Sequence, residues 1–266
     1  MSDLDALPER YRLILCDIWG VVHDGITLYP GSAERLRRWK GEGRRIILIT
    51  NAPRTAEAVQ AQLDRIGLPR DCYDGIETSG EAGIAALLAL GEPVGFIGTQ
   101  SDRAIMEGRN VPLAEDGFRH LACVGLDEQR RAAADYAGQL EACEQGGVIL
   151  HCLNPDRIVM RGSVAEPCAG ALADMYEALG GIVIWYGKPH ETIYRHALKL
   201  GGNPPADAVL AVGDSLQTDI LGAARMGFDA IFVTGGIHGG EPFPGDFSAR
   251  HGLGDWQPIA QLDSLS

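Results

Sequence analysis

Short apolar runs alternate with longer stretches of helical period along the whole chain. Eight runs have the character of buried strands, at residues 12–16, 45–49, 93–97, 119–124, 147–152, 182–186, 208–212 and 229–233. Apolar spacings of three and four residues predict helices between most of them, most clearly at 32–40, 55–66, 127–143, 167–179, 191–200 and 216–226. This alternation is typical of an α/β fold with a parallel sheet.

Polar side chains follow four of the predicted strands, at the point where each strand ends. A carboxylate follows the run at 12–16, a hydroxyl and an amide follow the run at 45–49, and an ammonium follows the run at 182–186. Two carboxylates in the segment GDSLQTD, at 213–219, follow the run at 208–212. Because the carboxyl ends of strands in an open parallel sheet line one crevice, we expect these groups to converge there. They belong to Asp17, Thr50, Asn51, Lys188, Asp214 and Asp219.

The order of these residues resembles that of the haloacid dehalogenase superfamily of aspartate-nucleophile enzymes, over essentially the whole chain. Further segments narrow the resemblance to phosphatases with a large α/β cap inserted after the second motif, of the sugar phosphatase and p-nitrophenyl phosphatase kind. These segments are ITNAPRT at 49–55, NPD at 154–156, PCAGAL at 167–172 and GKPHETIY at 187–194. The resemblance implies a Rossmann-like parallel-sheet core at 1–79 and 183–266, with a smaller α/β cap domain at 80–182.

The stretch between residues 78 and 182 holds three strand-like runs but no site motif other than NPD, as expected of an inserted second domain. The resemblance places NPD on the cap, facing the core. Asn154 and Asp156 are therefore predicted to bind substrate together with Asn51. An Asn-Pro-Asp turn with no further role is the alternative.

The resemblance also implies a phosphatase-type hydrolase that acts on a small phosphorylated metabolite. Asp17 is the predicted nucleophile, because a carboxylate is ionised at neutral pH and its attack on phosphorus gives an aspartyl phosphate, which divides one difficult displacement into two. The Thr50 hydroxyl, the Asn51 backbone N–H and the Lys188 ammonium are predicted to hold the charge of the transferred phosphoryl group.

The predicted cofactor is Mg²⁺, which favours an all-oxygen shell with one or two carboxylates and several waters. By resemblance its ligands are the Asp17 carboxylate, the backbone carbonyl of Trp19 and Asp214, with Asp219 as a more distant or an additional ligand. Lys188 would keep the crowded carboxylates ionised by placing an opposite charge nearby.

Trp19 is the one clear departure from the family pattern, which has a second aspartate there as general acid and base. An indole N–H donates a hydrogen bond but does not exchange protons near neutral pH. Three outcomes stay open: a slow phosphatase whose substrate has a good leaving group, recruitment of His23, Asp24 or a cap residue, or a non-enzymatic phosphate-binding or metabolite-binding protein. A metal-independent dehalogenase also carries an aromatic residue here, but the retained GDSLQTD segment disfavours it, because paired carboxylates without a cation are costly.

Composition limits the partners. The formal net charge is −13 and the pI about 4.9, a balance that repels nucleic acid and anionic membrane surfaces and favours a small metabolite held by a local site. The six cysteines form no CxxC pair, and no apolar run approaches the roughly 18 residues of a membrane helix. We therefore expect a cytoplasmic protein without membrane or nucleic-acid partners, and a homo-oligomer stays open.

Overall fold

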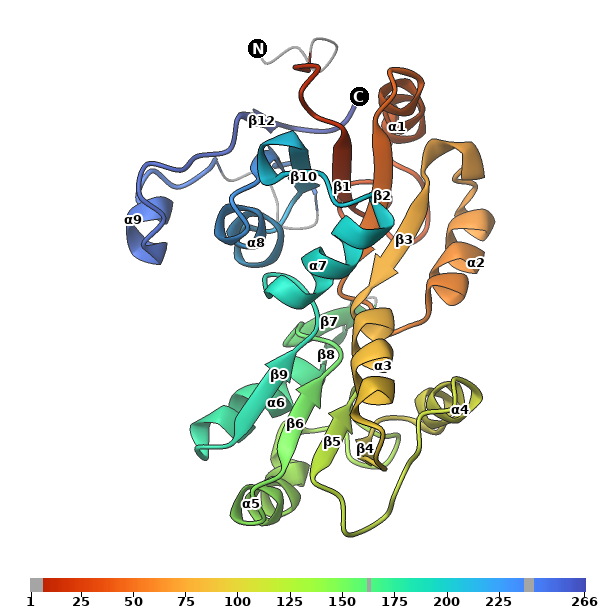
Figure 1. Cartoon of the computed structure of the whole chain (residues 1–266), viewed down its shortest axis with the longest axis vertical. Coiled ribbons are helices and arrows are strands. Elements are labelled where there is room, and N and C mark those ends of the chain that lie inside the picture. The colour runs from red at the N-terminus through yellow and green to blue at the C-terminus, as the bar shows by residue number, and fades with distance from the viewer. Residues whose placement is uncertain (1–6, 162–163, 237–241) are drawn as a thin grey trace. The chain divides into compact units, whose positions relative to one another are not determined.

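A computed structural model describes residues 7–161, 164–236 and 242–266 (Figure 1). The chain divides into two units, one comprising residues 1–50, 56–77 and 188–266 and the other residues 51–55 and 78–187. The roles of core for 1–79 and 183–266 and of cap for 80–182 stay predictions. None of the helices in the described ranges is long and apolar enough to cross a membrane.

A six-stranded sheet forms the centre of the first unit. In their order across the sheet, its strands are β12 (Ala260–Leu262), β11 (Asp229–Val233), β10 (Val209–Gly213), β1 (Leu13–Asp17), β2 (Arg45–Thr50) and β3 (Gly75–Thr78). The pairs from β12 to β2 are parallel. All five residues of β1 are buried, as expected of a central strand covered on both faces. Figure 1 shows β10, β1 and β2 side by side.

Within the described part of this unit, five α-helices accompany the sheet. They are α1 (Ser32–Gly41), α2 (Ala56–Ile66), α7 (Glu191–Leu200), α8 (Leu221–Arg225) and α9 (Phe247–His251). On one face of the sheet, Leu15 of β1 and Ile47 of β2 belong to the same buried cluster as Ile193 of α7. A turn with π-helical hydrogen bonding, Leu216–Ile220, follows β10 and runs directly into α8.

The second unit has a four-stranded parallel sheet and a hairpin. The sheet is β4 (Gly95–Ile97), β5 (His120–Cys123), β6 (Ile149–Cys152) and β9 (Ile182–Trp185), the antiparallel hairpin is β7 (Ile158–Arg161) and β8 (Val164–Pro167), and the helices are α3 (Ser79–Leu90), α4 (Gln100–Gly108), α5 (Ala137–Gln145) and α6 (Ala169–Ala178). Successive residues of β5 enter different cores: Leu121 packs with Leu140 of α5, and Ala122 packs with Leu87 of α3. Helices therefore cover both faces of this sheet.

The predicted α/β class with a parallel-sheet core is confirmed, and each of the eight predicted strands is present. The helix predicted over 127–143 is wrong in its first part, because α5 begins only at Ala137. The Asp127 carboxylate accepts hydrogen bonds from the backbone N–H groups of Gln129 (2.9 Å) and Arg130 (2.6 Å), and this local bonding closes a turn instead. The helix predicted over 216–226 is π-helical in its first turn.

Candidate active site

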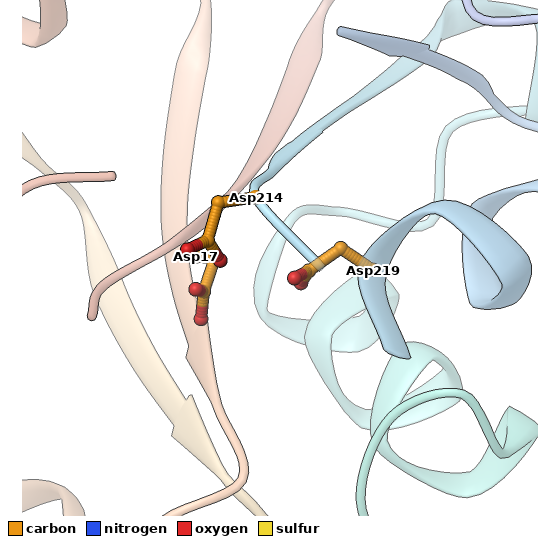
Figure 2. Close-up of side chains that lie close together, drawn as sticks. All are labelled: Asp17, Asp214 and Asp219. Atoms are coloured by element: carbon orange, nitrogen blue, oxygen red, sulfur yellow. The ribbon is translucent and has the colours of Figure 1, made fainter. Parts of the chain in front are cut away.

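Three aspartates of the first unit lie close together at the carboxyl ends of neighbouring strands (Figure 2). Asp17 ends β1, and Asp214 directly follows β10, which pairs with β1. Asp219 lies in the π-helical turn after β10. A carboxylate oxygen of each lies within 4.8 Å of the others, and all three residues are buried. We call Asp17, Asp214 and Asp219 the aspartate cluster.

Lys188 bridges two members of this cluster. Its Nζ donates hydrogen bonds of 2.6 Å to Oδ1 of Asp17 and of 2.6 Å to Oδ1 of Asp219. The three side chains are only 4%, 9% and 4% exposed, in the order Lys188, Asp17 and Asp219. Charge-assisted hydrogen bonds between buried groups are strong and fix side-chain positions. Lys188 therefore holds Asp17 and Asp219 in place.

The electrostatics of these groups leave negative charge in excess. Burial and the carboxylate of Asp219 raise the pKa of Asp17 well above its usual value, and Lys188 opposes this shift. Burial also lowers the pKa of Lys188, but the two bonded carboxylates more than offset burial, so the net pKa is raised and the side chain stays an ammonium. With Asp214, three carboxylates face one ammonium. A further cation would compensate this excess.

The donor set fits Mg²⁺. Three buried carboxylates lie close enough together to share one ion, and they supply the hard oxygen ligands that this ion takes. The residues that could hold it are Asp17, Asp214 and Asp219. Ligation by the backbone carbonyl of Trp19 stays a prediction.

Two glycines that the motif spacing does not single out make room for Asp214. A Cβ on Gly20 would lie 2.0 Å from Oδ2 of Asp214, and a Cβ on Gly236 would lie 2.3 Å from the same oxygen. Gly20 also has a φ of 91°, which L side chains rarely adopt. Any side chain at either position would displace the carboxylate, so both glycines belong to the site. For Gly20, the sequence offered one signal: this glycine lies three residues after the predicted nucleophile Asp17.

The remaining predicted site residues fall in two places. Thr50 ends β2 in the first unit, and its preceding residue, Ile49, pairs in register with Asp17. The other three lie in the second unit and are joined to one another. Nδ2 of Asn51 donates to Oδ1 of Asp156 (2.9 Å), and Oδ1 of Asn154 accepts from the backbone N–H of Asp156 (3.2 Å). The structure thus brings the three predicted substrate-binding residues into one hydrogen-bonded group.

Trp19 lies on a loop whose polar side chains bond the loop itself. Nδ1 of the buried His23 accepts a hydrogen bond of 2.8 Å from the backbone N–H of Gly25. Oδ1 of Asp24 accepts from the backbone N–H groups of Thr27 (2.7 Å) and Ile26 (2.8 Å), and these bonds lower the pKa of Asp24. A carboxyl group with a lowered pKa is ionised at neutral pH and makes a poor proton donor. His23 and Asp24, the two candidate replacements for the general acid that lie on this loop, are thus engaged in shaping it.

Comparisons with known proteins cover the segments that hold these residues. A sequence model of the family described as haloacid dehalogenase-like hydrolase matches residues 14–112, and a second, HAD-hydrolase-like model matches residues 185–251. The first match contains Asp17 and Thr50, and the second contains Lys188, Asp214 and Asp219.

Individual proteins match over most of the chain. A hydrolase of the haloacid dehalogenase-like family from Brucella suis 1330, known as a crystal structure, is 34% identical, with 100% of both chains covered and a TM-score of 0.84. Ribonucleotide monophosphatase NagD of Escherichia coli K12 is 28% identical over 84% of this chain and 88% of that protein. An acid sugar phosphatase of Staphylococcus aureus USA300 is 25% identical over 86% of this chain and 88% of that protein. These matches confirm the resemblance, including its phosphatase branch, and the chain belongs to the haloacid dehalogenase-like hydrolase family.

Proposed function

We propose that this protein is an Mg²⁺-dependent phosphatase that acts on a small phosphorylated metabolite through an aspartyl phosphate. The observation that carries the proposal is the buried site in which Lys188 bridges Asp17 and Asp219, with Asp214 beside them. Two relatives with phosphatase names support it. The net charge of −13 favours a small substrate over a polyanion.

Asp17 is the proposed nucleophile. One of its carboxylate oxygens attacks phosphorus, the bond from phosphorus to the leaving oxygen breaks, and the leaving group takes that electron pair. Lys188, bonded to Asp17, orients the carboxylate and favours its ionised form. Water then attacks the phosphorus of the aspartyl phosphate, and the bond from phosphorus to the Asp17 oxygen breaks, with its electron pair returning to the carboxylate. Inorganic phosphate leaves, and the proton of the attacking water passes to solvent.

Charge on the phosphoryl group must be held by fixed donors during transfer. We assign this role to the Thr50 hydroxyl and the Asn51 backbone N–H, in addition to Lys188. Mg²⁺ held by Asp17, Asp214 and the Trp19 carbonyl, with Asp219 as a supporting or additional ligand, would supply positive charge to the phosphoryl oxygens when bound.

We assign the second unit the role of a cap that contributes substrate contacts. The hydrogen-bonded group of Asn51, Asn154 and Asp156 supports this assignment, because it offers amide and carboxylate groups that can bind the hydroxyl or amino groups of a metabolite. We also place the enzyme in the cytoplasm, which its six cysteines with free thiols support.

The indole of Trp19 restricts the chemistry of the leaving group. General acid catalysis contributes roughly 10²- to 10⁴-fold in rate, and an indole cannot supply it. The leaving oxygen therefore departs as an anion. We therefore propose that the enzyme hydrolyses aryl and acyl phosphates, whose leaving groups are stable as anions, and hydrolyses alkyl phosphates only slowly.

The second candidate is a non-enzymatic phosphate-binding or metabolite-binding protein. Trp19 favours this candidate because the indole stands where the family has its general acid and base. A screen of phosphate esters with and without Mg²⁺, including a 2-haloacid, separates the candidates. We expect Mg²⁺-dependent release of phosphate from aryl or acyl esters, and its loss in Asp17→Asn. Binding without turnover in every reaction would favour the second candidate. Metal-independent halide release would instead identify a dehalogenase.

A further inference from the structure

The side chain of Trp19 is exposed where its neighbours are buried. From Asp17 to His23 every residue is buried except Trp19, which is 39% exposed. Two residues of chain span at most about 7 Å. The Cα of Trp19 therefore lies within about 7 Å of the Cα of Asp17, so the exposed indole is close enough to contact a molecule whose phosphate is bound at Asp17.

The indole is held against the loop rather than being free to rotate. A Cβ on Gly25 would lie 3.2 Å from Cζ2 and 3.3 Å from Cη2 of Trp19, so the Gly25 backbone packs directly on the benzene ring of the indole. The ring of His23 lies 6.2 Å from that of Trp19, centroid to centroid, and is tilted by 55°. One part of the indole is thus fixed by contact, and another part is available to a ligand.

The loop that carries these contacts is itself closed by backbone hydrogen bonds. The N–H of Gly20 donates to the carbonyl of His23 (2.9 Å), and the N–H of Val22 donates to the carbonyl of Ile18 (2.8 Å). Gly25 has a φ of 98°, a conformation that glycine adopts without strain, and this turn of the backbone brings the chain against the indole. An aromatic surface held in this way loses little conformational entropy when a ligand covers it.

We propose that Trp19 is a specificity-determining residue whose indole stacks on the planar aromatic leaving group of a phosphate ester, so that the preferred substrates are phosphate esters of phenols. This inference rests on the proposed phosphatase function. Aromatic rings pack favourably with centroids 4.5–7 Å apart, and a phenolate departs without a proton donor. Trp19, which stands in place of the general acid, thus also binds the phosphate esters whose leaving groups depart without one.

Binding of two phosphonates, which have no cleavable ester bond, tests the inference without any chemical step. In isothermal titration calorimetry with Mg²⁺, the wild type should bind phenylphosphonate at least about tenfold more tightly than methylphosphonate. The ratio should be retained in Trp19→Phe and fall below about threefold in Trp19→Leu. Ile26→Ala, which alters another exposed apolar residue of the same loop (82% exposed), should leave the ratio unchanged.

The outcomes separate the inference from the proposed function. Equal wild-type affinity for the two phosphonates, or an unchanged ratio in Trp19→Leu, would overturn the role of Trp19 and leave the phosphate site standing. A wild type that binds neither phosphonate in the presence of Mg²⁺ would overturn the phosphate site and the inference together.

Discussion

Replacing Lys188 by methionine removes the one ammonium that bridges Asp17 and Asp219. Both hydrogen bonds are 2.6 Å long and all three side chains are buried. Breaking a buried ion pair in this way leaves uncompensated charge and costs about 3–5 kcal/mol. In a unit of this size that corresponds to a decrease of roughly 6 to 20 °C in Tm at neutral pH.

The penalty in Lys188→Met should depend on pH with a definite sign. Without the ammonium, the folded-state pKa of Asp17 rises further above its usual value, so the native state takes up a proton that the unfolded state does not. The penalty is therefore greatest at neutral pH and shrinks as the pH falls and the carboxylates become neutral. Mg²⁺ should also recover part of the lost stability.

Urea and thermal unfolding at pH 7.5 and pH 5 measure this effect. Lys199→Met is the matched control, because Lys199 is exposed on α7 and its loss should change stability by less than about 0.5 kcal/mol. The double variant Lys188→Met/Asp219→Asn should be no less stable than Lys188→Met alone, since it removes one negative charge together with the positive one. A Lys188→Met protein as stable as the control, or equally destabilised at both pH values, would refute the reasoning.

Three further predictions concern the metal, a buried histidine and the loop glycine. Mg²⁺ at ten times its Kd should stabilise the wild type by about 1.4 kcal/mol and leave the Tm of Asp214→Asn unchanged; an equal increase in both would remove Asp214 from the metal site. Burial lowers the pKa of His151 to about 4, so the folded protein resists protonation of this side chain. The free energy of unfolding should therefore fall by up to roughly 3 kcal/mol as the pH decreases from 6.5 to 4. Urea unfolding should show this decline in the difference between wild type and His151→Asn. Gly25→Ala should lose more stability than Gly43→Ala and weaken phenylphosphonate binding, because both positions have positive φ but only a Cβ at 25 meets Trp19; equal effects of the two changes would contradict the packing argument.

The fold could be predicted from sequence wherever both faces of an element are buried. The central strands β1, β2 and β10 are nearly continuous apolar runs, which is the pattern of a covered parallel sheet. The short strands β3 and β12 lie at the edges of the sheet, mix polar with apolar residues, and are not predicted. Helix α3 is also not predicted, because its sequence SGEAGIAALLAL is apolar almost throughout and lacks a polar face.

The candidate site was predictable in its residues but not in its surroundings. Strand ends on one edge of a parallel sheet meet whatever their distance along the chain, so the grouping of Asp17 and Asp214 follows from topology. The same rule does not account for Lys188, because the run before it forms β9 of the four-stranded sheet and not a strand of the sheet that holds Asp17. The close packing of Gly236 on Asp214 depends on a loop path that no periodicity encodes. The exposure of Trp19 and its closeness to Gly25 likewise depend on the path of the loop and could not be read from the position of Trp19 two residues after Asp17.

The central claim is that this site transfers phosphoryl groups but lacks a general acid. The dependence of turnover on the leaving group tests that claim most directly. In the wild type, kcat with Mg²⁺ should fall steeply from aryl to alkyl phosphates. Trp19→Asp restores a carboxylate and should raise the rate of the first step, transfer of the phosphoryl group to Asp17, by at least about 10² for alkyl phosphates, with little change in that rate for aryl phosphates. The cost in stability should be modest, because Trp19 is 39% exposed. A wild type that hydrolyses alkyl phosphates as fast as aryl ones, with a bell-shaped pH profile, would contradict the account.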